Sequence, residues 1–220
     1  MEGLDIVLSV EGTVYYTTDC TVPTRYSHRY TEPIHLTKTT VIRAVCIPEN
    51  SIPSEVLDLT YLINENDQLA TIAIVTSPEN LWDNDTGIYV EGDGAQEAEP
   101  HYGANYWNDW EKPASISLFE SEGGGFSANC GIRIFGYYSR AEAKKSLACF
   151  FRDSYGDGEI TYPLFGENSL DTYESFILRS SGQDVFTARM RDVVITSLVS
   201  DHTDVPVQDY RPVVVYLNGE

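Results

Sequence analysis

The side chains that bind metals in proteins are present in this sequence but lack the spacing of a metal site. Four cysteines (Cys20, Cys46, Cys130 and Cys149) occur without a C-x-x-C pair, and the four histidines are scattered along the chain. Zinc sites need ligands at short, regular spacings, so the sequence predicts no metal site of this kind. Cys130 and Cys149 lie in apolar, strand-like runs, where we favour buried free thiols over a disulfide.

Two further segments suit ion or phosphate binding in composition, but each lacks a required residue. A run that begins at Asp153 and contains Gly158 is similar to part of a calcium-binding loop, yet its twelfth position is Leu164 instead of glutamate. We therefore favour a hairpin turn there. Gly123-Gly124-Gly125 is followed neither by Lys-Ser/Thr nor by a helical pattern, so it predicts a loop tip and not a phosphate-binding loop.

Four aromatic residues lie in a segment without periodicity. They are Tyr102, Tyr106, Trp107 and Trp110, within residues 91–112, which predict a long loop rich in Gly, Glu, Asp and Asn. Flat rings on such a loop can stack on the CH groups of sugars. The alternative, which we favour, is a packed loop anchored by these rings.

The overall charge limits the partners of this chain. Its 220 residues contain 34 acidic and 14 basic side chains, a net charge of -20, without a basic cluster. Phosphate backbones and anionic lipids would be repelled, so we expect no nucleic acid partner and no membrane insertion. The apolar runs, such as Val213–Leu217, are far shorter than the roughly 20 residues that span a bilayer. The first residues have no signal-peptide character.

The spacing of apolar and turn residues predicts a mainly β chain that positions these groups. Residues 5–63 predict a small sandwich, and the polar residues 64–68 predict a linker. The expected sandwich strands are Ile6–Val10, Val14–Thr18, Ile34–Leu36, Val41–Ile47 and Glu55–Ile63. Further strands are expected at Thr71–Thr76, Ala114–Glu120, Cys130–Gly136, Ser146–Arg152, Ser175–Arg179 and Pro212–Leu217.

Two helices are expected among these strands. Ser77 and Pro78 suit the N-cap and the first position of a single helical turn. A longer helix is predicted from Asp184 onward, because apolar residues recur there at three- and four-residue steps. These residues are Phe186, Met190, Val193, Val194 and Leu198. We expect this helix to pack one face on the sheet.

The last residues suggest a chain that continues. The apolar strand Val213–Leu217 leads into Asn218-Gly219, the strongest two-residue hairpin signal, and the sequence stops at Glu220. A hairpin turn without a second strand predicts a fragment of a longer protein, with Val213–Leu217 at the edge of a sheet.

Two stretches resemble known families. Residues 8–61 resemble the chitobiase C-terminal-like domain of secreted bacterial proteins, through Thr13–Thr24 and Tyr30–Ala44, although Cys20 stands where that family usually has glycine. Residues 70–220 resemble the CotH family of atypical, secreted protein kinases, which is named for a spore coat protein. The segments that carry this resemblance are Leu81–Val90, Gly131–Gly136, Ser139-Arg140, Lys144–Leu147, Tyr162–Phe165, Phe176–Arg179, Arg191-Asp192 and Arg211–Glu220.

The CotH resemblance implies phosphoryl transfer, with ATP and Mg²⁺ bound in the full-length protein. Such chemistry needs a phosphate-binding lysine, a carboxylate that orients it, acidic magnesium ligands and a base near the acceptor. In the family pattern the lysine maps to Lys145, a second phosphate-facing cation to Arg140 and the orienting carboxylate to Asp192. The remaining carboxylates of the family lie beyond Asn218-Gly219, so we expect this chain alone to be inactive and to require no cofactor.

Each of these residues also has a purely structural interpretation. Lys145 follows Lys144, and surface lysines at strand edges prevent unwanted pairing. Arg140 could begin a turn, and Asp192 could be a surface charge on a helix. If the predicted helix covers the strand Ser146–Arg152, we expect Lys145 and Asp192 to come within ion-pair reach, roughly 4 Å.

The combined interpretation is a mainly β protein with minor α content. We expect a small Ig-like β-sandwich at residues 1–64, a sandwich-like lead-in region at 65–128 and the start of a β-rich α+β kinase-like domain at 129–220. An extracellular or cell-surface location in a bacterium is expected, with a protein substrate or a cell-surface or carbohydrate partner. The alternative function is an extracellular carbohydrate- or cell-surface-binding β-sandwich module.

Overall fold

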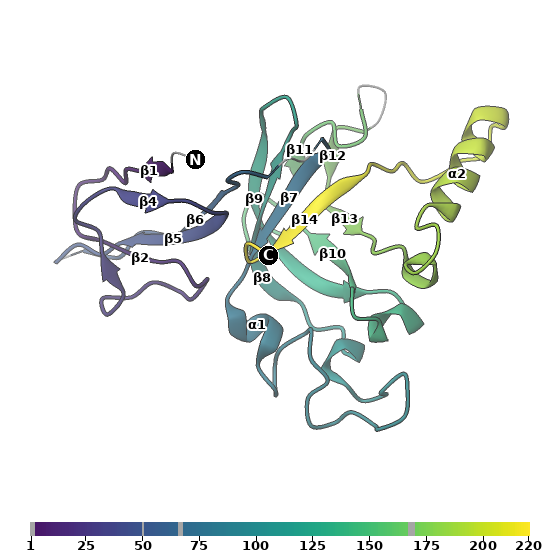
Figure 1. Ribbon diagram of the computed structural model, residues 1–220, viewed down its shortest axis with the longest axis horizontal. Coiled ribbons are helices and arrows are strands. Elements are labelled where there is room, and N and C mark those ends of the chain that lie inside the picture. Colours follow the sequence, from purple (N-terminus) through teal and green to yellow (C-terminus); the bar gives the residue numbers. More distant parts are fainter. Residues whose placement is uncertain (1–2, 50, 66–67, 167–169) are drawn as a thin grey trace. The chain divides into compact units, whose positions relative to one another are not determined.

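The computed structural model describes residues 3–49, 51–65, 68–166 and 170–220 (Figure 1). Within these residues the regular structure is mostly β, with two α-helices, neither long and apolar enough to cross a bilayer. The expectation of a mainly β chain with minor α content is confirmed. Two compact units are present: Met1–Pro78, Ala114–Ser127 and Val213–Glu220 form unit 1, and Glu79–Pro113 and Ala128–Pro212 form unit 2. The expected divisions after residues 64 and 128 stay predictions.

Unit 1 contains a small β-sandwich. One sheet pairs β1 with β4, and the other has the order β3-β2-β5-β6, with all neighbours antiparallel. Ile6, Val14, Leu36, Ile42 and Ala44 form one buried core to which both sheets contribute, which confirms the predicted sandwich. The strands are β1 (Leu4–Ile6), β2 (Val14–Thr17), β3 (His28–Arg29), β4 (Ile34–Leu36), β5 (Thr40–Cys46) and β6 (Leu57–Tyr61).

Strand β5 is buried on both faces, which explains why apolar and polar residues do not alternate along it. Ile42 faces the sandwich core, whereas Val41 packs with Cys20 and Val75 in a second cluster. The charged Arg43 is buried in the same strand because Asp58 lies beside it, with 2.8 Å between Arg43 Nε and Asp58 Oδ1. A charge in an apolar strand therefore has an ion-pair partner here and does not mark a solvent-facing side.

The second part of unit 1 is built around β7 (Ala70–Val75), all of whose residues are buried. β7 pairs with β8 (Lys112–Phe119) antiparallel and with β14 (Val213–Leu217) parallel, as Figure 1 shows for β14. The prediction that Val213–Leu217 is an edge strand is confirmed, because β7 is the one strand among the described residues with which β14 pairs. A one-turn helix, α1 (Pro78–Trp82), follows β7 as expected from Ser77 and Pro78.

The residues after β14 form the tight turn that the sequence predicts. Asn218 and Gly219 both have positive φ, 55° and 88°, as a two-residue hairpin turn requires. Leu217 and Glu220 exchange backbone hydrogen bonds of 2.7 and 3.2 Å across this turn. The side-chain Oδ1 of Asn218 also accepts the amide of Thr76 at 2.9 Å, so this turn is fixed to the end of β7.

In unit 2 the candidate residues follow a short antiparallel ladder. β10 (Ser146–Phe150) lies between β9 (Gly125–Phe135) and β13 (Ser175–Leu178). A small hairpin pairs β11 (Ile160–Thr161) with β12 (Thr172–Tyr173), beyond the turn expected near Asp153. In unit 1, Gly123 and Gly124 form the loop tip that the sequence predicts, and Gly125 begins β9. A Cβ at Gly125 would lie 1.8 Å from the Leu118 carbonyl oxygen. Cys130 and Cys149 are buried free thiols on β9 and β10.

The expected helix from Asp184 is wrong in its start and in its packing. α2 spans Arg191–His202, and Gly182–Asp184 form a separate 3-10 turn. Arg189 has a φ of 60°, a left-handed conformation that interrupts a helix between Asp184 and α2. No residue of α2 is buried, and Phe186 is 80% exposed. Figure 1 shows α2 projecting away from β10 and β13 of the same unit, so its apolar residues do not cover the sheet.

Candidate functional site

Lys145 immediately precedes β10, the strand between β9 and β13. Its side chain is buried, at 8% exposure, whereas the neighbouring Lys144 is exposed. The amide of Lys145 donates to the hydroxyl of Tyr89 at 3.1 Å. The structural interpretation of Lys145 as a surface lysine at a strand edge is therefore wrong, because the strand it introduces is paired on both sides.

The ammonium group of Lys145 lies among carbonyl oxygens and aromatic rings. Nζ donates to the carbonyl oxygens of Arg140 at 2.6 Å and of Glu142 at 3.0 Å. The same nitrogen lies 3.9 Å from the centre of the Tyr106 ring and 5.6 Å from that of Tyr89. Ring faces carry negative potential and attract a cation that has lost water. The local structure thus replaces much of the hydration of a charged lysine.

This environment changes the proton affinity of Lys145. Burial lowers the pKa of Lys145 to about 8 from its ordinary value of 10.5, and the carboxylates of Glu91 and Glu142 oppose the change. Burial also raises the pKa of the Tyr89 hydroxyl. The pKa of the Tyr106 hydroxyl is raised by burial and by the nearby carboxylate of Glu91. Near neutral pH the site therefore combines a charged amine with two neutral phenols.

Arg140 lies in the 3-10 turn η2 (Tyr138–Ala141), and its guanidinium group is fully engaged. Nε donates to the Gly136 carbonyl at 2.7 Å, and Nη1 donates to the Trp107 carbonyl at 3.1 Å. Nη2 forms an ion pair with Asp109 at 2.9 Å, which lowers the pKa of that carboxyl group. These contacts favour the structural interpretation of Arg140, in which it clamps the loop that contains Trp107 to the turn before Lys145.

Asp192 lies in the first turn of α2 and forms an ion pair with Arg179. Among the described residues, the structure pairs Asp192 with Arg179 and not with Lys145. We expected Lys145 and Asp192 to approach each other if the helix covered the strand after Lys145. This packing is absent, because α2 does not cover β10. Arg179 directly follows β13, and the register Leu147↔Leu178 places it at the same end of the strand pair as Lys145. The roles of Lys145, Arg140 and Asp192 stay predictions.

Sequence reasoning did not find the residues that surround Lys145. Tyr89 lies in Leu81–Val90, one of the segments that carry the family resemblance, and Tyr106 is one of four loop aromatics. Nothing in their spacing indicates that both contact one lysine. Arg179 was missed as the partner of Asp192. A basic residue directly after an apolar strand was the available signal, since such a residue has to leave the sheet core.

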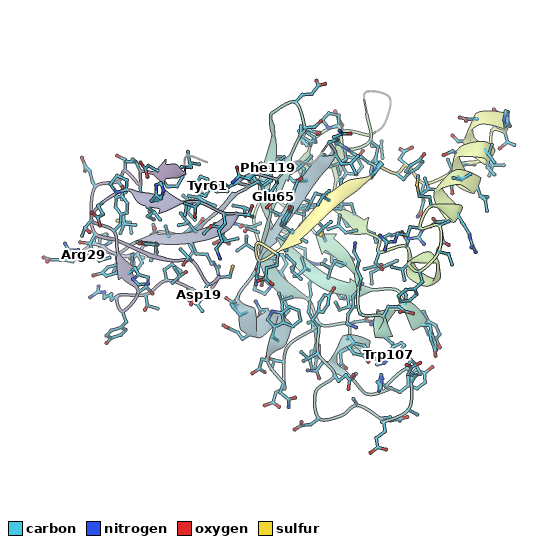
Figure 2. All side chains as sticks on the ribbon, viewed as in Figure 1. Asp19, Arg29, Tyr61, Glu65, Trp107 and Phe119 are labelled. Carbon is cyan, nitrogen blue, oxygen red and sulfur yellow. The ribbon has the colours of Figure 1, made fainter. Side chains whose placement is uncertain are left out.

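The loop aromatics divide into buried and exposed rings. Tyr106 is buried, which confirms the packed-loop alternative for this residue. Trp107 lies in η1 (Asn105–Trp107), where its indole Nε1 donates to the Pro100 carbonyl at 3.1 Å (Figure 2). Tyr102 and Trp110 are exposed. The loop is therefore anchored by some of its rings and presents others to solvent.

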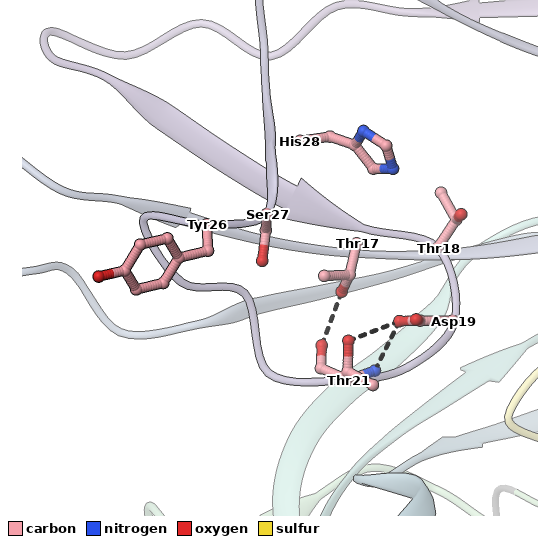
Figure 3. Close-up of a pocket in the computed structure, with 7 residues that line it drawn as sticks. All are labelled: Thr17, Thr18, Asp19, Thr21, Tyr26, Ser27 and His28. Carbon is pink, nitrogen blue, oxygen red and sulfur yellow. Dashed lines mark hydrogen bonds between the residues drawn. The ribbon is translucent and has the colours of Figure 1, made fainter.

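Unit 1 contains a separate polar groove of about 290 Å³ (Figure 3). Asp19 accepts hydrogen bonds from the amide and hydroxyl of Thr21, at 3.0 and 2.6 Å, and these bonds lower its pKa. Tyr26 is fully exposed at the side of the groove. Neither Lys145, Arg140 nor Asp192 lines it. The complete lining is Thr17, Thr18, Asp19, Thr21, Tyr26, Ser27 and His28.

The residues near Lys145 fit a phosphate group better than they fit a magnesium ion. Two N–H groups of Nζ bind carbonyls, which leaves one donor of the ammonium for a phosphate oxygen. Within the described part of the chain, no group of three or more Asp, Glu, His or Cys side chains could hold a metal ion. Magnesium binds through carboxylate, phosphate and water oxygens, and the described residues around Lys145 do not provide such a set of carboxylates.

Comparison with known families supports the expected order along the chain. Residues 5–58 match the family model of the chitobiase/beta-hexosaminidase C-terminal domain. Residues 132–220 match the family model of the CotH kinase protein. This order confirms the resemblance inferred from sequence. No curated protein and no solved structure matches the chain at a significant level.

Proposed function

We propose that the region matching the CotH kinase family belongs to a phosphoryl-transfer domain in which Lys145 contacts nucleotide phosphates. The observation that carries this proposal is the buried ammonium group at the start of β10, within residues 132–220. A buried lysine is costly unless its charge is used or fully compensated. In this proposal ATP supplies the phosphoryl group, and the acceptor is a protein hydroxyl.

The chain's own residues would hold the lysine ready for a phosphate. Tyr106 and Tyr89 exclude water from one side of Nζ, and the Arg140 and Glu142 carbonyls fix its position. A positive charge in such a site interacts more strongly with a phosphate than it would in bulk water. Arg140 acts here as a positioning residue, because its guanidinium holds the turn whose carbonyl orients Lys145.

Asp192 is proposed as the carboxylate of the same site. Its ion pair with Arg179 lies at the end of the β10–β13 pair where Lys145 is found. Both charges of this pair are substantially exposed, so exchanging the partner of Asp192 for another cation costs little. The proposal requires such an exchange when the nucleotide binds.

Nucleotide binding to the natural protein tests the proposal. Isothermal titration with ATP should show that Lys145→Met weakens binding by about tenfold or more, since a charge-assisted hydrogen bond contributes roughly 1.5–3 kcal/mol. Lys144→Met is the matched control, because Lys144 is the exposed neighbour, and it should bind as the unmodified protein does. Equal ATP affinities of the two variants would show that Lys145 does not contact the nucleotide.

A second candidate function is supported by the groove of unit 1. Among the described residues, the hydroxyls of Thr18 and Tyr26 have no hydrogen-bond partner within the chain, so they can bind a polyhydroxylated ligand. Hydroxyls, one carboxylate and an exposed ring suit a neutral saccharide. On an array of neutral oligosaccharides, Tyr26→Ala should abolish binding, whereas Tyr210→Ala, which changes an exposed tyrosine outside the groove, should preserve it. Binding that survives Tyr26→Ala would refute this candidate.

We also propose a cellular location for the protein. An extracellular or cell-surface position in a bacterium is supported by the two family matches. Fractionation of a producing culture, with detection by an antibody to this chain, should find the natural protein outside the cell membrane. Recovery in the cytoplasmic fraction alone would contradict it.

A further inference from the structure

Three rings of unit 2 form a surface that the proposed phosphoryl transfer does not use. We call Tyr102, Trp107 and Tyr137 the aromatic corner. The ring centres of Trp107 and Tyr102 are 5.0 Å apart with an interplanar angle of 38°, and those of Trp107 and Tyr137 are 6.3 Å apart at 77°. Tyr102 is 45% exposed and Tyr137 is 77% exposed. Two differently oriented ring faces therefore flank one central indole at the surface.

The central ring of the aromatic corner is held in place. The indole Nε1 of Trp107 donates to the Pro100 carbonyl at 3.1 Å, and the amide of Trp107 donates to Ala104 at 3.0 Å. The carbonyl of Trp107 accepts from Arg140 at 3.1 Å. Because these bonds already fix the ring, a ligand that binds it loses little additional side-chain entropy.

The segment that carries Tyr102 and Trp107, two of the three rings, is strongly acidic. Residues 91–111 contain six acidic residues and no Lys or Arg. The amide of Gln96 donates to the Tyr102 carbonyl at 3.0 Å, which closes a loop from which Glu97 and Glu99 project into solvent. Asp109, two residues after Trp107, is exposed as well and has Arg140 as its ion-pair partner. Carboxylates thus lie on the same segment as Tyr102 and Trp107, whereas Tyr137 lies outside it.

We propose that the aromatic corner binds a lysine or arginine side chain of a basic peptide segment in a partner protein. Aromatic faces attract cations, most strongly those of tryptophan, and nearby carboxylates add to this attraction. Arginine also stacks its planar group on rings. The net charge of -20 draws basic partners and repels acidic ones. A neutral saccharide would use the rings but would gain nothing from Glu97 and Glu99.

The test titrates the chain with peptides and follows the indole N–H resonance of Trp107 by NMR at 150 mM salt. The probe is a ten-residue peptide of alternating Arg and Gly, and its control has Gln at each Arg position. We expect the Arg peptide to shift the resonance and the Gln peptide to leave it unchanged. Tyr137→Leu should weaken binding about threefold, as the loss of one cation–π contact implies, and Tyr137→Phe should restore it.

Two controls separate a specific site from general attraction to an acidic protein. Tyr210→Leu removes an exposed tyrosine outside the corner, and Glu32→Gln with Glu55→Gln removes two exposed charges elsewhere. Both should bind the Arg peptide as the unmodified chain does, whereas Glu97→Gln with Glu99→Gln should bind it about threefold more weakly. Equal affinity of Tyr137→Leu and Tyr210→Leu would overturn the proposal. An equal response to the Gln peptide or to a neutral oligosaccharide, or no response to the Arg peptide, would also overturn it.

Discussion

The ammonium nitrogen of Lys145 lies 3.9 Å from the centre of the Tyr106 ring, with both residues buried. This pair joins a loop aromatic to the first residue before β10, across 39 positions of the sequence (145 − 106). Among the described residues no carboxylate forms an ion pair with Lys145, and this contact explains how the lysine can still be buried, because a ring face and two carbonyls replace its hydration. Burial of the same ammonium group lowers its pKa to about 8, a range in which its titration can be measured.

Lys145 should make stability rise with pH between about 8 and 10.5. Its pKa in the folded chain is lowered to about 8 from 10.5, so over this range the unfolded chain binds more protons than the folded chain. The burial cost of the charged form is thus present below about pH 8 and is relieved as the pH rises. The free energy of unfolding, measured by urea denaturation, should increase relative to that of Lys145→Met from pH 8 to pH 10. A difference that stays constant or falls would contradict this.

Arg140→Met should loosen the loop around Trp107. The substitution removes the bonds to the Gly136 and Trp107 carbonyls and the ion pair with Asp109, at a cost of about 2 kcal/mol. Hydrogen exchange of the amides in residues 105–109 should become faster. The exposed Arg25, changed to Met, serves as the control and should leave these amides unaffected. Unchanged exchange in Arg140→Met would show that the guanidinium does not clamp this loop.

Arg43→Met should destabilise unit 1 by about 3–5 kcal/mol, because the substitution leaves the buried carboxylate of Asp58 without its cation. Arg25→Met should change the free energy of unfolding by no more than about 0.5 kcal/mol. The double variant Arg43→Met with Asp58→Leu should recover much of the loss, since no buried charge remains. If Arg43→Met lowers the free energy of unfolding no more than Arg25→Met does, the ion pair between Arg43 and Asp58 contributes little to stability.

The sequence predicted the structure correctly where the pattern of apolar residues on one strand face, or the residues of a single turn, determine the local fold. The core of the sandwich follows from apolar residues such as Ile42 and Val14, and the Asn218-Gly219 turn follows from the positive φ that both residues tolerate. The two-residue strands at His28–Arg29 and Thr172–Tyr173 are too short to produce a periodic pattern, so they were not expected.

The start of α2, its packing and the contacts of Lys145 could not be predicted from local sequence patterns. Apolar residues at helical spacing predicted a packed helix, but spacing alone does not reveal the left-handed Arg189 that delays its start or whether a sheet lies beneath it. Lys145 was identified through family resemblance, whereas its contacts with Tyr89 and Tyr106 depend on loops that are distant in sequence. Contacts of this kind are set by tertiary structure.

The exposed face of α2 leads to a further expectation. Val194→Ser and Leu198→Ser should each change the free energy of unfolding by no more than about 0.5 kcal/mol, because neither side chain is buried. Ile132→Ala, on β9, is the matched comparison and should cost about 2–5 kcal/mol, since Ile132 is fully buried. Chemical denaturation of the three variants measures these differences. A loss of several kcal/mol in either serine variant would mean that α2 does pack on the rest of unit 2.

The most direct measurement of the central claim is covalent labelling of the natural protein with an acyl-phosphate derivative of ATP. The reagent forms an amide with a lysine amine that lies beside the bound phosphates, and the nucleotide leaves with the phosphate. The chain has four lysines, Lys38, Lys112, Lys144 and Lys145, which peptide mass spectrometry can distinguish. We predict acylation of Lys145 that excess ATP prevents. Labelling of the exposed Lys144 without labelling of Lys145, or labelling of Lys145 that ATP does not reduce, would contradict a phosphate-facing Lys145.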